Sequence, residues 1–363
     1  MKIIYKLLFL FLLTIGYSSC DFLDIVPDEI TTEADAFKDR NAAKNFVYSC
    51  YGYLPQSNVA SGSLDLLTGD EVITAFEHET FASFPKGNYT ASSPVISYWN
   101  TFFQGLRQCY IFLENVDKVP DLTESVKTDY IAQVKFLIAY YHYQLARCYG
   151  PIILIKELPD VNASQAEYLP RTSYDECVDW ICNLLDEAAS SLPAIRTNKE
   201  DYGLATSVGA KAVKAKMLLY AASPLFNGNS SFYSNFTDKS GSQLMPLTYD
   251  PNKWVKAKTA IKEAIDLAEQ NGHALYVKQD YKIGNEDANP YPAAGPVRCL
   301  RTSLVDWDSR NPEVLLAETR SEGSYGIQNK SLPFVTDGWA WNGVGPTWTM
   351  LNLSLIHISE PTR

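Results

Sequence analysis

The chain has 363 residues, enough for one large domain or two ordinary ones, and 46% of them are hydrophobic. Its 42 acidic and 31 basic side chains leave a formal net charge of −11. Because phosphate binding requires basic patches, a chain this acidic is a poor candidate for binding nucleic acid.

The first 19 residues have the layout of a secretory signal peptide. Two lysines precede an apolar stretch from Leu7 to Ile15, and small residues then lead to Cys20. The apolar stretch is too short for a stable membrane-spanning helix. We therefore predict a lipoprotein signal peptide at 1–19 and lipidation of Cys20, which would hold a soluble domain at the membrane surface without crossing it.

One residue departs from the usual lipoprotein pattern. Tyr17 stands where such a signal normally carries Leu or another aliphatic residue. A plain signal peptide cleaved near Ser19, or a single membrane-spanning anchor, therefore stays open as an alternative.

Helices dominate the rest of the chain. Hydrophobic periodicity predicts them at 98–117, 125–149, 173–192, 205–222 and 252–270. The first four fall into two helix hairpins, which resemble tetratricopeptide-type pairs although their linkers vary too much for a strict repeat. The helix at 252–270 has no evident partner downstream.

Local signals refine these helices. Ser173 and Glu176 have the spacing of a capping box at the start of the third helix. Trp99, Trp180 and Trp254 occupy helical positions, and we expect them to be core residues.

Long irregular stretches at 54–97, 223–250 and 273–350 separate or follow the helices, and loops of this length in a helical scaffold are usually functional. Two of them carry clusters of aromatic residues beside polar ones. Sugar rings stack their apolar faces on aromatic rings, while amides and acids beside them bind the hydroxyls. We select as candidate ligand contacts Phe76, His78, Tyr325, Trp339, Trp341 and Asn342. The alternative is that these side chains pack the loops onto the scaffold.

Catalytic and metal motifs are absent from the sequence. It has no GxSxG, HExxH or Walker A motif, and the six cysteines after Cys20 have no CxxC pair or zinc spacing. We therefore predict no enzyme activity, no metal and no cofactor. His142 lies in an apolar helix and is expected to be a hydrogen-bonded core residue. Disulfides between the six cysteines stay open.

The last eleven residues, LSLIHISEPTR, neither continue a predicted helix nor supply a cap. They resemble a translated sequencing-adapter tail. We therefore expect 353–363 to be non-native and the domain to cover 20–352, incomplete at its C-terminus.

Five segments, in order, resemble the SusD/RagB family of surface lipoproteins of Bacteroidetes. They are CDFLDIVPDE (20–29), WNTFFQGLRQCYIFLENVDKVP (99–120), AQVKFLIAYYHYQLARCYGPIIL (132–154), LPRTSYDECVDWICNLLDEAASSLP (169–193) and AKAVKAKMLLYAASPLFNG (210–228). The last two are the most specific. The resemblance covers residues 20–350, and the family's last helical repeat has no counterpart in the sequence.

The resemblance implies an all-α scaffold of tetratricopeptide-like hairpins with a long, loop-rich ligand-binding face. It also implies a non-enzymatic lipoprotein on the outer face of the outer membrane, which binds oligosaccharide and delivers it to a SusC-type TonB-dependent transporter. Two alternatives stay open: a peptide-binding RagB-like lipoprotein, and a helical-repeat scaffold with a protein partner only. A lipid-anchored glycoside hydrolase is disfavoured by the helical scaffold. Ligand residues vary between family members, so no strict motif transfers them.

Overall fold

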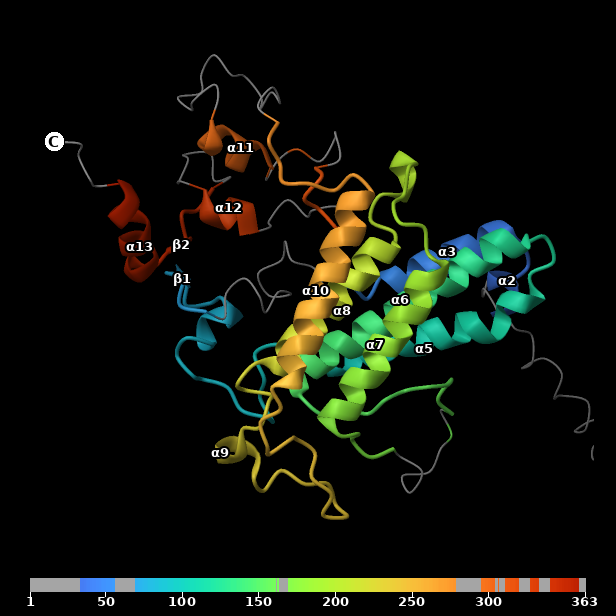
Figure 1. The fold of residues 1–363 in the computed structure, drawn as a ribbon, viewed down its shortest axis with the longest axis horizontal. Helices are drawn as coiled ribbons and strands as arrows, with labels where there is room; N and C mark the ends of the chain where they lie inside the picture. The colour runs from blue at the N-terminus through green and yellow to red at the C-terminus, as the bar shows by residue number, and fades with distance from the viewer. Residues whose placement is uncertain are drawn as a thin grey trace, which may run out of the picture.

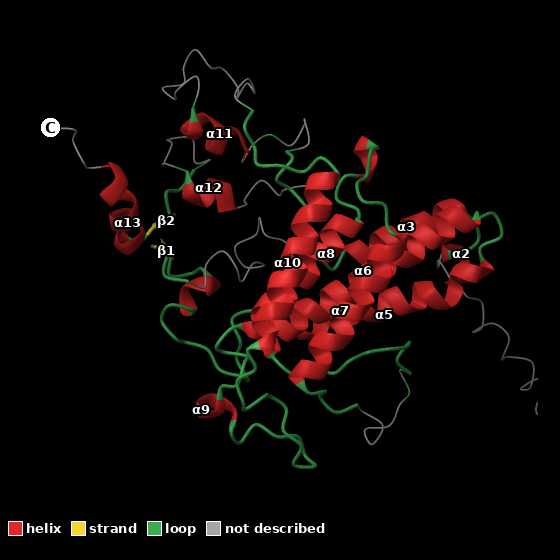
Figure 2. Cartoon of the chain, viewed as in Figure 1, coloured by secondary structure: helices red, strands yellow, loops and turns green. Residues whose placement is uncertain are grey.

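The structure is a computed structural model that describes residues 33–55, 69–160, 162, 169–278, 295–303, 306, 311–319, 327–332 and 340–358. Within these ranges the chain is mostly helical, as Figure 2 shows. The strands β1 (Val72–Thr74) and β2 (Val344–Pro346) form a two-stranded sheet. The predicted helical fold class is therefore confirmed. The predicted signal peptide and Cys20 lie outside the described residues.

Six helices form the scaffold: α3 (Arg40–Tyr51), α5 (Trp99–Asn115), α6 (Glu124–Tyr149), α7 (Tyr174–Ser191), α8 (Ser207–Ala222) and α10 (Asn252–Gln270). Each packs against the next along the chain (Figure 1). The five predicted helices are confirmed to within a few residues at each end. The partner of α10 is the preceding helix α8, which it contacts through the alanine face Ala257, Ala260, Ala264 and Ala268.

Shorter elements lie between and after these helices. They are α2 (Glu33–Ala36), η2 (Thr80–Ser83), η3 (Val116–Lys118), η5 (Lys199–Asp201), α9 (Ser230–Tyr233), α11 (Pro296–Ser303), α12 (Ile327–Ser331) and α13 (Trp348–Ile358). The expectation that residues 353–363 continue no helix was wrong, because α13 runs from Trp348 to Ile358. That the segment is non-native stays a prediction.

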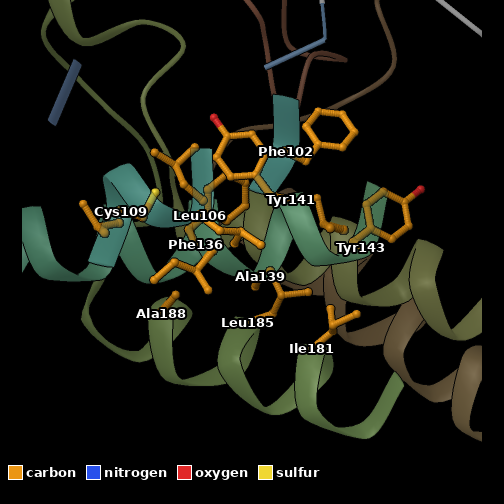
Figure 3. Packing of buried hydrophobic residues seen from close by; sticks show 14 of the residues in the cluster. Phe102, Leu106, Cys109, Phe136, Ala139, Tyr141, Tyr143, Ile181, Leu185 and Ala188 are labelled. Carbon is orange, nitrogen blue, oxygen red and sulfur yellow. The ribbon is translucent and has the colours of Figure 1, made fainter. Parts of the chain in front are cut away.

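The core is centred on α6, which lies between α5 and α7 (Figure 3). Phe102 and Leu106 of α5 lie on one side of α6, and Ile181 and Leu185 of α7 lie on the other, and none of these four or Phe136 of α6 is more than 1% exposed. Burying one such side chain stabilises the fold by about 1.5–3 kcal/mol. This explains why the sequence of α6 is apolar nearly all round.

His142 ties α6 to the extended segment that follows it. Its Nδ1 lies 2.8 Å from the carbonyl oxygen of Ile138, and its Nε2 accepts a hydrogen bond of 3.1 Å from the amide of Ile155. The ring packs edge-on against Trp180 at a centroid distance of 4.8 Å. Burial lowers the pKa of His142 to about 4, so the ring is neutral near pH 7. The predicted hydrogen-bonded core histidine is confirmed.

Side chains cap two scaffold helices. Asp39 accepts a hydrogen bond of 2.8 Å from the amide of Ala42 at the start of α3, and Thr206 accepts one of 3.0 Å from Gly209 in α8. Ser173 is the N-cap residue of α7, but its side chain makes no cap hydrogen bond, so the predicted capping box is wrong. Gly150 ends α6 in a positive-φ conformation, at φ 71°, where a side chain would be strained.

The three scaffold tryptophans differ in burial. Trp99 and Trp180 are half-buried and pack against the core, as predicted. Trp254 is 41% exposed, which corrects the prediction that it is a core residue. The α8-facing side of α10 is made of alanines, and Trp254 instead lines a shallow hollow with Leu219, Ile261 and Ile265. Among the described residues, no helix combines the length and the apolar character needed to span a bilayer.

Candidate ligand-binding site

Two loop segments far apart in the sequence meet at the sheet formed by β1 and β2. The strands pair antiparallel, with Val72 opposite Pro346 and Thr74 opposite Val344. This sheet lies apart from the scaffold helices in Figure 1. The pairing brings the segment after β1, which carries Phe76 and His78, beside the segment before β2, which carries Trp341 and Asn342. We call residues 69–79, 329–332 and 340–348 together the loop platform.

Hydrogen bonds extend the pairing beyond the strands. The hydroxyl of Thr74 and the amide of Ala75 both donate to the carbonyl oxygen of Gly343, at 2.8 and 3.1 Å. At the other end, Thr347 donates through its amide to the carbonyl of Glu71 at 2.9 Å and through its hydroxyl to that of Asp70 at 2.7 Å. The two segments are therefore bonded at both ends of a three-residue ladder.

The side chain of Phe76 covers one side of the paired β1 and β2 segments. Its ring lies directly on Gly343, so closely that a β-carbon at position 343 would overlap the ring. The ring is half-buried, and its centroid lies 5.4 Å from that of His78. Phe76 therefore holds the two segments together, and only part of its surface is left to contact a ligand.

An ion pair joins the same two segments. Lys330 in α12 pairs with Glu79, and their side chains are only 16% and 10% exposed. His78, beside them, is 76% exposed, and its Nε2 lies 3.7 Å from a carboxylate oxygen of Glu79. The exposed imidazole of His78 can donate or accept a hydrogen bond.

The residues before β2 are held by α12. The amides of Trp341, Asn342 and Gly343 donate to the carbonyls of Asn329, Leu332 and Lys330, at 3.0, 2.9 and 2.8 Å respectively. Among the described residues, Asn342 is the one non-glycine with positive φ, at 47°, a conformation that Asn tolerates better than most residues. Its side chain is exposed, and Trp341 beside it is half-buried.

The structure thus gathers four of the six predicted contacts, namely Phe76, His78, Trp341 and Asn342, on the loop platform. Trp339 and Tyr325 lie outside the described residues. Sequence reasoning missed Thr74, Gly343 and the pair of Glu79 with Lys330, which hold the platform together. No local signal marks these residues, because Thr74 and Gly343 are 269 positions apart and each strand has only three residues.

The platform offers side chains that could contact a ligand. It presents an indole, an imidazole and a carboxamide on a braced backbone, and the carboxylate of Glu79 beside His78 is in an ion pair with Lys330. Within the described ranges, no three His, Cys, Asp or Glu side chains are grouped so as to hold a metal ion.

Comparison with known proteins extends this description. Residues 21–219 match a SusD-like protein-family model described as starch-binding and associating with the outer membrane. A curated relative, SusD-like protein P25 of Formosa agariphila, is 23% identical over 230 residues, which are 60% of this chain and 43% of that protein.

Solved structures resemble the fold over a larger part of the chain. The structure of BT4246 is 30% identical with a TM-score of 0.73, and the match covers 86% of this chain and 56% of that one. A SusD-like protein (BF3747) from Bacteroides fragilis is 20% identical with a TM-score of 0.64, covering 88% and 53%. The chain spans about half the length of these relatives.

Proposed function

The chain belongs to the SusD/RagB family, and from this we propose that it binds oligosaccharide at the cell surface and passes it to a SusC-type TonB-dependent transporter. The observation that carries the proposal is the loop platform, which unites two aromatic loops on one braced surface. A site of this kind binds its ligand and releases it unchanged, so we also propose that the protein is not an enzyme.

We assign the stacking role to Trp341, together with Trp339 and Tyr325 from the same loop. The apolar face of a sugar ring fits an indole or phenol ring, and aromatic contacts of this kind contribute about 0.5–1.5 kcal/mol beyond the area they bury. Trp341 suits the role because its backbone amide is fixed to Asn329 while part of its side chain stays accessible.

We assign hydrogen bonding to the ligand hydroxyls to His78 and Asn342. Both are exposed, and both are attached to backbone that the platform fixes. A rigid site loses less conformational entropy on binding than a mobile loop does, which raises affinity for the same contacts.

In this proposal, lipidation of Cys20 determines where the protein is located. Acylation of its thiol would tether the domain to the outer membrane, in keeping with the description of the family as associating with that membrane. Export to the outer face would put the loop platform where external oligosaccharide first meets a transporter. Mass spectrometry of the membrane-bound protein tests lipidation, and co-purification of a TonB-dependent transporter tests the partnership.

Isothermal titration with malto-oligosaccharides and a panel of other neutral oligosaccharides and peptides tests ligand binding. We expect one oligosaccharide class to bind, and Trp341→Ala to weaken that binding about tenfold, which corresponds to about 1.4 kcal/mol. Trp254→Ala is the matched control, because Trp254 is exposed on α10. Equal affinity of the two variants would contradict the assignment of the site. Binding of peptides in place of sugars would favour a RagB-like peptide carrier, and turnover of a bound sugar would contradict a non-enzymatic role.

A further inference from the structure

A second concave surface lies on the scaffold. It is a groove of about 890 Å³ lined by one face of α3, the first turns of α6, and residues between Ser190 and Leu204. We call it the scaffold groove. In Figure 1 the helix α3 lies on the side of the molecule opposite β1 and β2, and the groove shares no residue with the loop platform.

The polar floor of the scaffold groove is formed by Asp129, Gln133 and Arg196, which belong to a closed ring of hydrogen bonds with Tyr51 and Ala205. Arg196 pairs with both carboxylate oxygens of Asp129, at 2.9 and 2.8 Å, and also donates to the carbonyl of Ala205. Gln133 donates to Asp129 at 2.8 Å and accepts from the hydroxyl of Tyr51 at 2.9 Å. The amide of Ala205 donates to that same hydroxyl and completes the ring.

Within this ring of hydrogen bonds, the charged groups are paired with one another. The guanidinium of Arg196 and the carboxylate of Asp129 neutralise each other, and the side chain of Arg196 is only 12% exposed. The polar floor therefore has a fixed shape. What the groove offers to a ligand comes from the groups on its walls.

Two cations stand on the α3 wall. Arg40 and Lys44 are four residues apart, so they lie on one face of the helix, and both line the groove. A hydrogen bond with Tyr48 and, more weakly, the charge of Asp201 raise the pKa of Lys44, which keeps its ammonium charged. The Lys44 ammonium lies over the ring of Tyr48, 5.4 Å from its centroid.

Both cations are close to Tyr130 on the opposite wall. Burial raises the pKa of Tyr130, and the positive charges of Lys44 and Arg40 act against that rise. The Tyr130 hydroxyl therefore stays protonated and can donate a hydrogen bond beside the two cations. Ser190, Asn198 and two further carboxylates complete the lining: Glu124, which pairs with Lys127 at 2.9 Å, and Asp201, whose negative charge acts on Lys44.

We propose that the scaffold groove is a second carbohydrate site and that it takes an acidic sugar unit, a uronate whose carboxylate lies between Arg40 and Lys44. A carboxylate is the group that two such cations bind best, and Arg binds it in bidentate geometry. Ring hydroxyls of the uronate would reach the hydroxyls of Tyr130 and Ser190 and the carboxamide of Asn198. The volume of the groove fits a short oligosaccharide.

The experiment titrates the full chain at low salt with tetragalacturonate and, separately, with maltotetraose. The test variant is the double substitution Arg40→Gln with Lys44→Met, which removes both charges and keeps most of each side chain. The matched control is Lys262→Met, because Lys262 is an exposed helical lysine on α10. Tri-glutamate is the third probe, since an acidic peptide carries carboxylates without the sugar ring.

We expect tetragalacturonate to bind the wild-type chain and the Lys262→Met variant equally, and the double variant at least tenfold more weakly. Binding should also weaken as salt rises. Trp341→Ala should leave this binding unchanged, which separates the scaffold groove from the loop platform. The proposal is overturned if tetragalacturonate does not bind, if the double variant binds it as tightly as the wild type, if maltotetraose binds the groove equally well, or if tri-glutamate competes with equal affinity.

Discussion

At the scale of single residues, His142 shows how a polar side chain becomes part of a hydrophobic core. A buried polar group is tolerated when it is hydrogen-bonded, and both ring nitrogens of His142 have backbone partners. The residue therefore fixes the segment after α6 against that helix. Its Nε2 accepts a hydrogen bond, so protonation of this nitrogen would break the contact with Ile155.

This arrangement predicts a pH dependence of stability. The folded-state pKa of His142 is lowered from 6.5 to about 4, so at pH 7 the ring is neutral in both the folded and the unfolded chain. As the pH falls below 6.5 the unfolded chain binds a proton that the folded chain does not, and stability falls until about pH 4. The loss amounts to about 3 kcal/mol, at 1.36 kcal/mol for each pKa unit.

Urea unfolding at several pH values between 7 and 4 measures this loss. We expect His142→Gln to be less stable than the wild type at pH 7 but to lose about 3 kcal/mol less between pH 7 and 4. His78→Gln is the control, because His78 is 76% exposed, and it should follow the wild-type curve. Parallel pH curves for the wild type and His142→Gln would rule out this account.

Sequence reasoning succeeded at the residue scale where burial is decided locally. The apolar neighbours of His142 indicated a core position, and the structure agrees. It failed for Trp254 and Ser173, because each outcome depends on a neighbouring element. The alanine face of α10 leaves Trp254 outside the contact with α8, and the Ser173 side chain makes no cap bond although its spacing to Glu176 is correct.

At the scale of elements, the helices and the loop platform were unequally predictable. The scaffold helices carry apolar stripes and end signals that periodicity detects, such as Gly150 and Pro151 after α6. The helix α3 has the same kind of stripe, in Ala43, Val47 and Cys50, but was not predicted. The β1–β2 pairing has no such signal, because two three-residue strands separated by most of the chain leave no periodic pattern.

The close contact between Gly343 and Phe76 gives a prediction about these paired strands. Gly343→Ala would place a methyl group inside the Phe76 ring. The ring would therefore have to move, which would separate the segment after β1 from the segment before β2. Overpacking of this kind costs about 1–3 kcal/mol. Gly345→Ala is a matched control on the same strand, because a β-carbon at Gly345 meets nothing within 4 Å.

Hydrogen exchange at the amide of Ala75 measures how often these two segments separate, because this amide donates to the Gly343 carbonyl. We expect exchange about tenfold faster or more in Gly343→Ala, and wild-type exchange in Gly345→Ala. Equal exchange in the two variants would mean that Phe76 does not brace the platform.

At the scale of the whole molecule, the scaffold and the loop platform differ in how they are stabilised. The scaffold has a continuous core in which α6 is buried by neighbours on both sides. The loop platform depends on a short ladder, one ion pair and one aromatic contact. Regions with few buried apolar contacts open at a lower free energy than the core, so the platform can open while the scaffold stays folded.

Residue-resolved hydrogen exchange of the full chain, with and without the best oligosaccharide of the titrations, tests this difference. Amides in the middle of α6, such as that of Leu137, should exchange only through global unfolding, whereas that of Ala75 should exchange through local opening. Because a ligand stabilises only the state that binds it, oligosaccharide at a hundredfold excess over its dissociation constant should slow exchange at Ala75 about a hundredfold. The local opening of Ala75 and its slowing by ligand together would show that the platform opens independently of the scaffold and that the oligosaccharide binds its closed form. Equal protection of Ala75 and Leu137 in the free protein would instead mean that platform and scaffold unfold as one unit.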